Sequence, residues 1–183
     1  MFMDFEKEMA SLGKMLNEIK GMPNKSSDRK SYDKVGFVYD TKRLLDTLKF
    51  FYENVVAKQT GDPKTSYYHL KINPKEHQVV YVNFNRGYPK ELFDGHYCYI
   101  LKKYRSLYLV IPATSVENIE NDPIQDFEID ILVNGLPKAM RLNLANIRGV
   151  DLQRIYSSKG VFNVVTDKSM IIEQISSKLF GEI

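Results

Sequence analysis

Two hydrophobic patterns divide the chain into a helical N-terminal part and a strand-rich remainder. In the first predicted helix, apolar residues stand three and four positions apart, which places them on one face. These residues are Phe2, Phe5, Met9, Leu12, Leu16 and Ile19. Gly21, Pro23 and the polar residues 24–30 end this helix. A second helix is predicted to begin with Asp40 as its N-cap and to carry an apolar stripe, namely Leu44, Leu48, Phe51 and Val55.

From Tyr67 onward, short apolar runs separated by Asn, Gly, Pro and Asp are typical of strands and turns. Six strands are predicted, at residues 67–72, 77–84, 96–102, 107–113, 127–133 and 139–144. Asp167 is expected to cap a C-terminal helix, with inward-facing Ile171, Ile172, Ile175 and Leu179. The pattern therefore favours a helical extension over residues 1–63 and a small barrel domain over residues 64–183.

The composition excludes several classes of protein. The net charge of +3 and the pI near 8.8 permit a polyanionic partner without requiring one. The single Cys98 rules out an intramolecular disulfide, and no motif for a metal or cofactor is present. No apolar run approaches the roughly 18 residues of a membrane span, and acidic residues near the N-terminus argue against a signal peptide. We expect a soluble cytoplasmic protein without metal, cofactor or membrane partner.

The residues with the most suggestive chemistry lie between positions 78 and 115. A loop over residues 85–94 is long for a hairpin, and such loops often carry function. His96 begins the next predicted strand, and Thr114 and Ser115 end the strand after it. A strand start and a strand end can meet on one rim of a small barrel. An imidazole suits proton transfer there, and a hydroxyl can donate a hydrogen bond to a phosphate.

The order of these residues resembles that of the MazF/PemK family of toxin endoribonucleases. In that family an aromatic strand end is followed by a loop Glu, then by an Arg-Pro pair opening an apolar strand, and later by a catalytic Thr. Here Phe84 ends the strand, Glu91 follows seven residues later, and Thr114 ends the later strand. His96 and Tyr97 stand at the Arg and Pro positions. Residues 144–155 are similar to the family's late segment with Ile-Arg, an acidic residue and Arg-Leu.

The resemblance implies an α+β, mainly β fold, namely an SH3-like small β-barrel with an N-terminal helical extension and a C-terminal helix. It also implies a homodimer that cleaves single-stranded RNA without a metal, leaves a cyclic phosphate, and is inhibited by an antitoxin protein. His96 and Thr114 become the predicted catalytic residues. Because histidine lacks the permanent charge and bidentate fork of arginine, Arg86 on the loop is the candidate for the missing charge.

Tyrosines and basic side chains near these strands favour contacts with unpaired bases. The predicted RNA-binding residues are Arg86, Glu91, Tyr97, Lys102 and Ser115. Structural interpretations stay open, because tyrosine is a common strand residue, a lone histidine at a strand start is usually a rim residue, and Arg148 and Arg154 can pair with carboxylates such as Asp151.

Two alternative functions also stay open. Histidine in place of arginine supports a non-catalytic barrel that binds RNA or protein. In the other alternative, the N-terminal helices dock a partner and the barrel is a scaffold. A large exposed apolar face on the first helix would favour that alternative.

Overall fold

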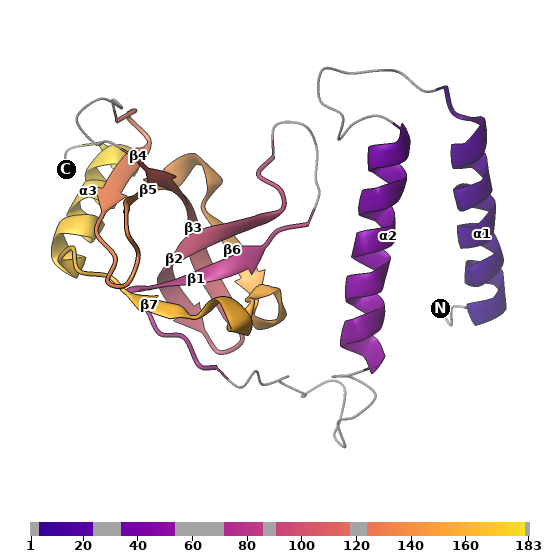
Figure 1. Ribbon diagram of the computed structural model, residues 1–183, viewed down its shortest axis with the longest axis horizontal. Coiled ribbons are helices and arrows are strands. Elements are labelled where there is room, and N and C mark those ends of the chain that lie inside the picture. Colours follow the sequence, from indigo (N-terminus) through magenta and orange to yellow (C-terminus); the bar gives the residue numbers. More distant parts are fainter. Residues whose placement is uncertain (1–3, 24–33, 54–71, 86–90, 118–123, 182–183) are drawn as a thin grey trace. The chain divides into compact units, whose positions relative to one another are not determined.

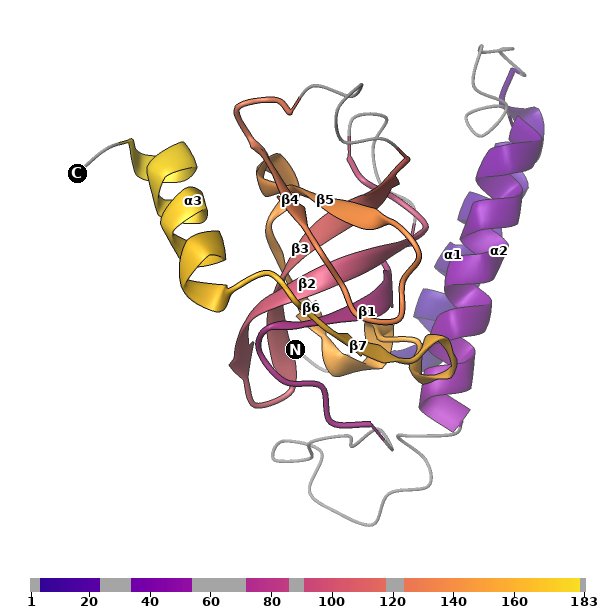
Figure 2. The ribbon, with the colours of Figure 1, turned by 60° about the vertical axis from the view of Figure 1, so that its left-hand side comes forward.

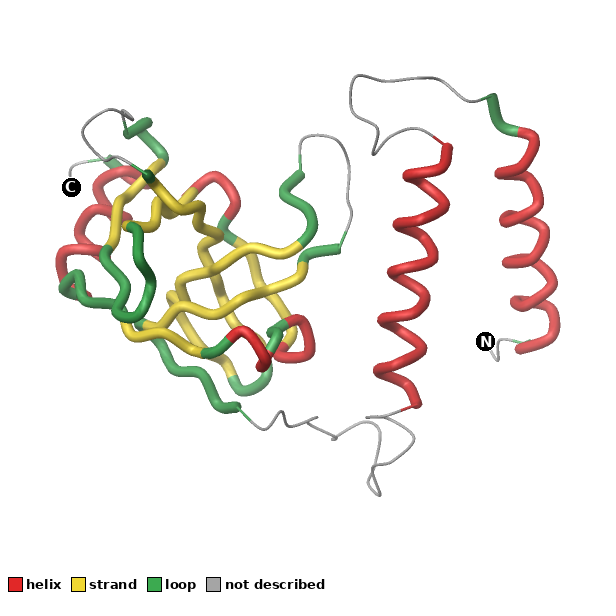
Figure 3. The backbone as a smooth tube through the Cα atoms, viewed as in Figure 1, coloured by secondary structure: helices red, strands yellow, loops and turns green. Residues whose placement is uncertain are grey.

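The computed structural model describes residues 4–23, 34–53, 72–85, 91–117 and 124–181 (Figures 1 and 3). The chain forms two compact units, Met1–Tyr52 and Glu53–Ile183. Among the residues described, the first unit contains two helices, and the second contains a β-sheet and a C-terminal helix. The predicted boundary at residues 63 and 64 lies outside the described residues, as do Phe2, Val55 and all of the predicted strand 67–72 except its last residue.

Both predicted N-terminal helices are present, but one predicted cap is wrong. Helix α1 (Phe5–Gly21) begins after Asp4, whose side chain accepts hydrogen bonds from the backbone N–H groups of Glu6 and Lys7. Helix α2 (Lys34–Phe51) already includes Asp40 in its interior, so Asp40 is not its N-cap. Residues 35–39 are mostly β-branched or aromatic, and their weak intrinsic helix propensity hid the first turns of α2.

The described part of the second unit contains seven strands, all paired antiparallel. They are β1 (Gln78–Asn83), β2 (Gly95–Tyr104), β3 (Leu107–Val116), β4 (Glu128–Ile131), β5 (Ala139–Asn143), β6 (Arg148–Asp151) and β7 (Val161–Asn163). The order is β4-β5-β3-β2-β1-β7, and β6 pairs with β3. The five predicted strands that fall on described residues are confirmed, whereas β6 and β7 were not predicted.

The sheet curves until the segments that follow its two outermost strands, β4 and β7, pair with each other (Figure 2). Val133, just after β4, forms a bridge with Val164, just after β7. The backbone N–H of Val165 donates to the carbonyl oxygen of Leu132 at 2.8 Å. The fold is therefore α+β with an antiparallel, barrel-like sheet, and the SH3-like type of barrel stays a prediction.

Strands β1, β2 and β3 are buried on both faces, because alternate residues enter two different cores. On one face, the barrel core joins these strands to β4, β5 and the last helix through residues that include Val79, Tyr99, Ile111, Leu142 and Ile171. On the other face, a second core lies between the same strands and residues 150–155, and it includes Val80, Cys98, Val110, Val150 and Ile155. Burial on both faces explains the nearly continuous apolar runs of β1 to β3.

Helix α3 (Lys168–Phe180) packs beside β4 (Figure 1). Its predicted cap is confirmed, since Asp167 accepts hydrogen bonds from the backbone N–H groups of Ser169 and Met170. Ile171 and Ile175 are buried, but Ile172 and Leu179 are 38% and 43% exposed, so two of the four predicted inward positions are wrong. Among the described residues, no helix is long and apolar enough to cross a membrane.

Candidate functional site at the ends of β1, β2, β3 and β6

His96 and Thr114 lie on neighbouring strands and on the same face of the sheet. The β2–β3 ladder ends with the pair Tyr97 and Ala113, and His96 and Thr114 each lie one position beyond that pair. His96 also pairs with Val82 of β1. Because side chains alternate along a strand, His96 and Thr114 share the face that carries the second core, at the end of the sheet where β2 begins and β3 finishes.

A backbone contact orients the His96 ring. Its Nε2 atom lies 2.9 Å from the carbonyl oxygen of Phe93. A carbonyl oxygen can only accept, so Nε2 carries the hydrogen, and Nδ1 of the neutral ring holds a lone pair. Nδ1 has no hydrogen-bond partner among the described residues. The half-buried ring lies 6.3 Å from the Phe84 ring, centroid to centroid. Nδ1 is therefore the nitrogen that can accept a proton from a substrate.

Arg148 reaches the same phenylalanine from a distant part of the chain. It begins β6 and pairs with Val110 of β3, and its Cζ atom lies 4.8 Å from the centre of the Phe84 ring. Phe84 thus contacts both the His96 imidazole and the Arg148 guanidinium. Within the described residues, Arg148 forms no ion pair, so its charge is available to an anion.

The predicted pairing of Arg148 or Arg154 with Asp151 is not what the structure shows. Asp151 accepts a hydrogen bond from the backbone N–H of Gln153 at 2.8 Å. Nη1 of Arg154 donates to the backbone carbonyl oxygen of Asn83 at 3.3 Å. Arg154 therefore contacts the last residue of β1, Arg148 contacts Phe84 directly after it, and neither is neutralised by Asp151.

Cys98 shares the face of His96 but is not a candidate nucleophile. Its side chain is fully buried in the second core. Burial raises the pKa of the thiol above its usual range, although the positive charge of Arg148 acts in the opposite direction. Since the thiolate is the reactive form of cysteine, Cys98 has a packing role.

The predicted RNA-binding residues do not form one group. Tyr97 and Ser115 lie on the barrel-core face, opposite to His96. Lys102 lies six positions beyond His96 on β2, about 20 Å away, and forms an ion pair with Glu76 at 3.0 Å. Lys102 is therefore not part of the His96 cluster. Glu91 is exposed in the loop before β2, and Arg86 lies outside the described residues.

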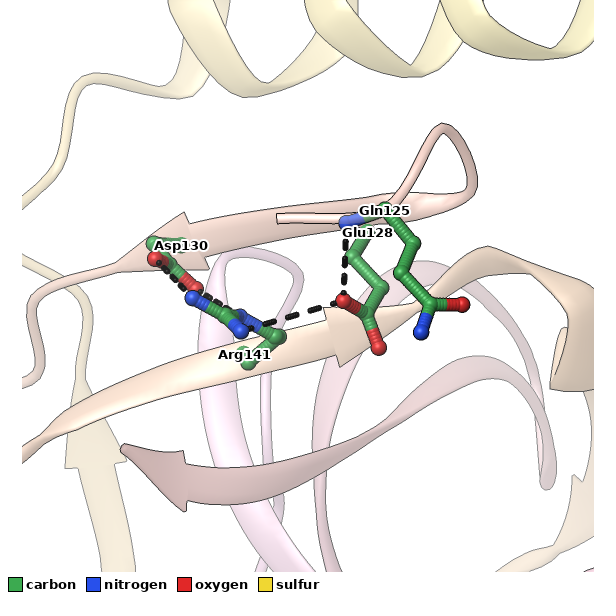
Figure 4. Close-up of polar contacts among 4 residues, drawn as sticks. All are labelled: Gln125, Glu128, Asp130 and Arg141. Carbon is green, nitrogen blue, oxygen red and sulfur yellow. Dashed lines mark hydrogen bonds and ion pairs between the residues drawn. The ribbon is translucent and has the colours of Figure 1, made fainter. Parts of the chain in front are cut away.

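On the far side of Thr114, strand β5 carries a second arginine, which the sequence analysis did not single out. Arg141 pairs with Thr114 in the β3–β5 ladder, and its side chain is 6% exposed. Its Nε and Nη2 atoms donate to the two carboxylate oxygens of Asp130 at 2.8 and 2.9 Å, while Nη1 lies 3.8 Å from Glu128 (Figure 4). The two carboxylates neutralise the charge of Arg141, and these ion pairs link β4 to β5 next to Thr114.

Comparisons with known proteins assign no family. No model of a protein family matches the chain, and no curated protein sequence matches it significantly. Among the described residues, no group of three or more His, Cys, Asp and Glu side chains is placed to bind a metal ion. Membership of the MazF/PemK family therefore stays a proposal based on residue order and on the site geometry.

Proposed function

We propose that this protein is a MazF/PemK-like endoribonuclease that cleaves unpaired RNA without a metal ion. The observation that supports this most is the contact of an imidazole and an unpaired guanidinium with the same Phe84 ring, on the sheet face that also carries the Thr114 hydroxyl. His96 and Thr114 each lie one position beyond the last β2–β3 pair, Tyr97 with Ala113. His96 also shares the Phe84 ring with Arg148. These side chains supply a base and a phosphate clamp, two of the groups that cleavage by the 2′-hydroxyl requires.

In the proposed reaction, Nδ1 of His96 accepts the proton of the 2′-hydroxyl. The 2′-oxygen then attacks phosphorus, and the bond from phosphorus to the 5′-oxygen breaks. The products are a 2′,3′-cyclic phosphate and a 5′-hydroxyl, whose proton comes from solvent. Arg148 stabilises the negative charge on the phosphoryl oxygens, and the Thr114 hydroxyl donates a hydrogen bond to one of them. Arg148 thus has the role that the sequence analysis gave to Arg86.

The test of this function is cleavage of unpaired RNA by the purified full-length protein in the presence of EDTA. We expect cleavage, with cyclic phosphate and 5′-hydroxyl ends identified by mass spectrometry. Binding of RNA without cleavage under any condition would instead support the non-catalytic RNA-binding barrel.

Replacing Arg148 by alanine is expected to lower kcat/KM for RNA cleavage by about 10²–10³-fold, as the loss of one preorganised charge-stabilising group typically does. Arg148→Lys should recover part of the activity, because lysine keeps the charge but not the bidentate fork. Arg105→Ala is the matched control, since Arg105 lies in the turn between β2 and β3 at the other end of these strands. If Arg148→Ala has the same kcat/KM as the wild type, Arg148 does not act as the phosphate clamp.

A second function, partner docking, is favoured by the N-terminal helices. None of the described side chains in α1 or α2 is buried. In α1 the exposed residues Phe5, Met9, Leu12 and Leu16 keep the alternating four- and three-residue spacing of coiled-coil seams. An exposed apolar face of this kind marks an interaction surface. We propose that it joins two copies of the chain in the homodimer, and an antitoxin protein is the alternative occupant.

Placing two carboxylates in this seam should dissociate the dimer. Leu12→Asp combined with Leu16→Asp is expected to weaken self-association by at least about 100-fold, because each buried leucine contributes about 1.5–3 kcal/mol. Ala10→Asp with Asn17→Asp adds the same charge outside the seam and should leave the dimer intact. Sedimentation equilibrium at micromolar concentration measures both. A wild-type monomer would contradict the homodimer.

A further inference from the structure

Four aromatic side chains gather next to the candidate site, on the barrel-core side of the sheet. Tyr81 and Tyr97 are partners across β1 and β2, and their ring centroids lie 5.2 Å apart in an edge-to-face arrangement. The ring of Tyr156 lies 6.0 Å from that of Tyr81, and the ring of Phe162 lies 5.8 Å from that of Tyr97. We refer to these four residues as the aromatic cluster.

The aromatic cluster extends to Gly95, which is the first residue of β2 and directly precedes His96. A Cβ atom at Gly95 would collide with the ring and hydroxyl of Tyr81, so glycine is what lets this ring lie against the backbone of β2. Tyr156 is 42% exposed, and the other three rings are half-buried. The cluster therefore presents aromatic surface to solvent immediately beside the start of β2.

Other tyrosines near these strands do not have this position. Tyr99 and Tyr108 are fully buried, and Tyr104 lies at the opposite end of β2. In β1 and β2, therefore, Tyr81 and Tyr97 belong to the aromatic cluster, whereas the other tyrosines either fill a core or lie apart from it.

Basic groups border the aromatic cluster. Nζ of Lys159 lies 5.6 Å from the centre of the Tyr81 ring. Arg154 donates to the carbonyl oxygen of Asn83, whose side-chain amide donates to the Tyr156 hydroxyl. Neither Lys159 nor Arg154 forms an ion pair within the described part of the chain. Aromatic rings beside uncompensated cations are the combination with which proteins bind unpaired nucleic acid.

We infer that the aromatic cluster is a stacking subsite for an unpaired nucleobase of the RNA strand whose phosphate lies at His96. This inference rests on the proposed function. Neighbouring residues of a strand point to opposite faces, so His96 and Tyr97 lie on opposite faces of the sheet at the start of β2. A single strand of RNA that passes over this end of β2 at Gly95 places a phosphate against His96 and Arg148. It places an adjacent base against Tyr97 and Tyr81.

The test separates binding from cleavage by using a fluorescent, unpaired 2′-deoxy oligonucleotide, which lacks the attacking hydroxyl. Tyr97→Ala in the full-length protein is expected to weaken binding by between about 5-fold and about 150-fold, the usual loss for one stacked base. Tyr97→Phe, which keeps the ring, should bind like the wild type. Tyr104→Ala is the matched control and should also bind like the wild type.

Two further variants keep the test decisive. Lys159→Ala should reduce the slope of log affinity against log salt by about one. If Tyr97→Ala unfolds, the more exposed Tyr156→Ala replaces it, with weakened binding again expected. Unchanged affinity in a folded Tyr97→Ala or Tyr156→Ala protein overturns the subsite, even if RNA is still cleaved. Weakened binding in a protein that cleaves no RNA supports the subsite and rejects the nuclease.

Discussion

His96→Ala is expected to lower the rate of RNA cleavage by about 10²–10⁴-fold, the usual contribution of a general base. The structural reason is the fixed ring, in which Nε2 donates to the carbonyl oxygen of Phe93 and Nδ1 is left to accept the substrate proton. Single-turnover cleavage of a labelled unpaired RNA in EDTA measures the effect. His77→Ala is the matched control, because His77 precedes β1 and its Nδ1 lies 3.2 Å from the Tyr99 hydroxyl.

The cleavage assays need a pH at which the protein stays folded, and His77 contributes to acid unfolding. Burial, reinforced by the charge of Lys168 and opposed by Asp167, holds the pKa of His77 below its ordinary value. Unfolding therefore takes up a proton, and the stability from neutral His77 is present above about pH 6.5 and lost as pH falls below it. Circular dichroism at each pH identifies the range in which the protein stays folded.

Three results decide the role of His96. A large loss in His96→Ala with a wild-type rate in His77→Ala supports the general base. Equal rates in His96→Ala and wild type would falsify it. If the wild type and both variants bind RNA but none of them cleaves it, the non-catalytic RNA-binding barrel becomes the better account.

The strands that could be predicted are those with a strong local signal. In β1, β2 and β3 both faces are buried, so residues such as Val79 and Val80 are apolar in succession and mark a strand without reference to the rest of the chain. Strand β6 has only one buried residue, Val150, and β7 has three residues with none buried. Their existence depends on pairing with β3 and β1, which a local pattern does not contain.

One part of the candidate site was also predictable from local sequence, and another part was not. The placement of His96 and Thr114 at the same end of the sheet was predictable, because the start of a strand and the end of the next antiparallel strand lie at the same end. Arg148 was not, because its contact with Phe84 depends on the pairing of β6 with β3 across 38 positions, from Val110 to Arg148. Loop residue Arg86 was the nearer arginine in sequence, and sequence distance is a poor guide within a sheet of non-local pairs.

Arg141 had a signal that the sequence analysis did not use. Glu128 and Asp130 alternate with isoleucines in β4, and Arg141 stands between Met140 and Leu142 in β5. Period-two alternation puts the charges of both strands on one face, and their opposite signs predict a cross-strand pair. The ladder places Asp130 directly opposite Arg141.

Asp130→Ala is expected to lower the free energy of unfolding by about 3–5 kcal/mol, because it leaves the buried guanidinium of Arg141 without its bidentate partner. Both side chains are mostly shielded from water, at 6% exposed for Arg141 and 12% for Asp130. Glu128, whose carboxylate lies 3.8 Å from Nη1, is too distant to replace two hydrogen bonds. Urea unfolding followed by circular dichroism measures the change.

Glu117→Ala is the control, because it removes a carboxylate that is 84% exposed and paired with Lys138, and exposed pairs contribute little. Its unfolding midpoint should stay close to that of the wild type. Asp130→Leu combined with Arg141→Met should recover most of the stability lost in Asp130→Ala, since removing both charges leaves neither unpaired. An unfolding midpoint of Asp130→Ala equal to that of Glu117→Ala would mean that Arg141 reaches solvent or another anion. In that case its charge, beside Thr114, would have to be counted with Arg148 in the phosphate clamp.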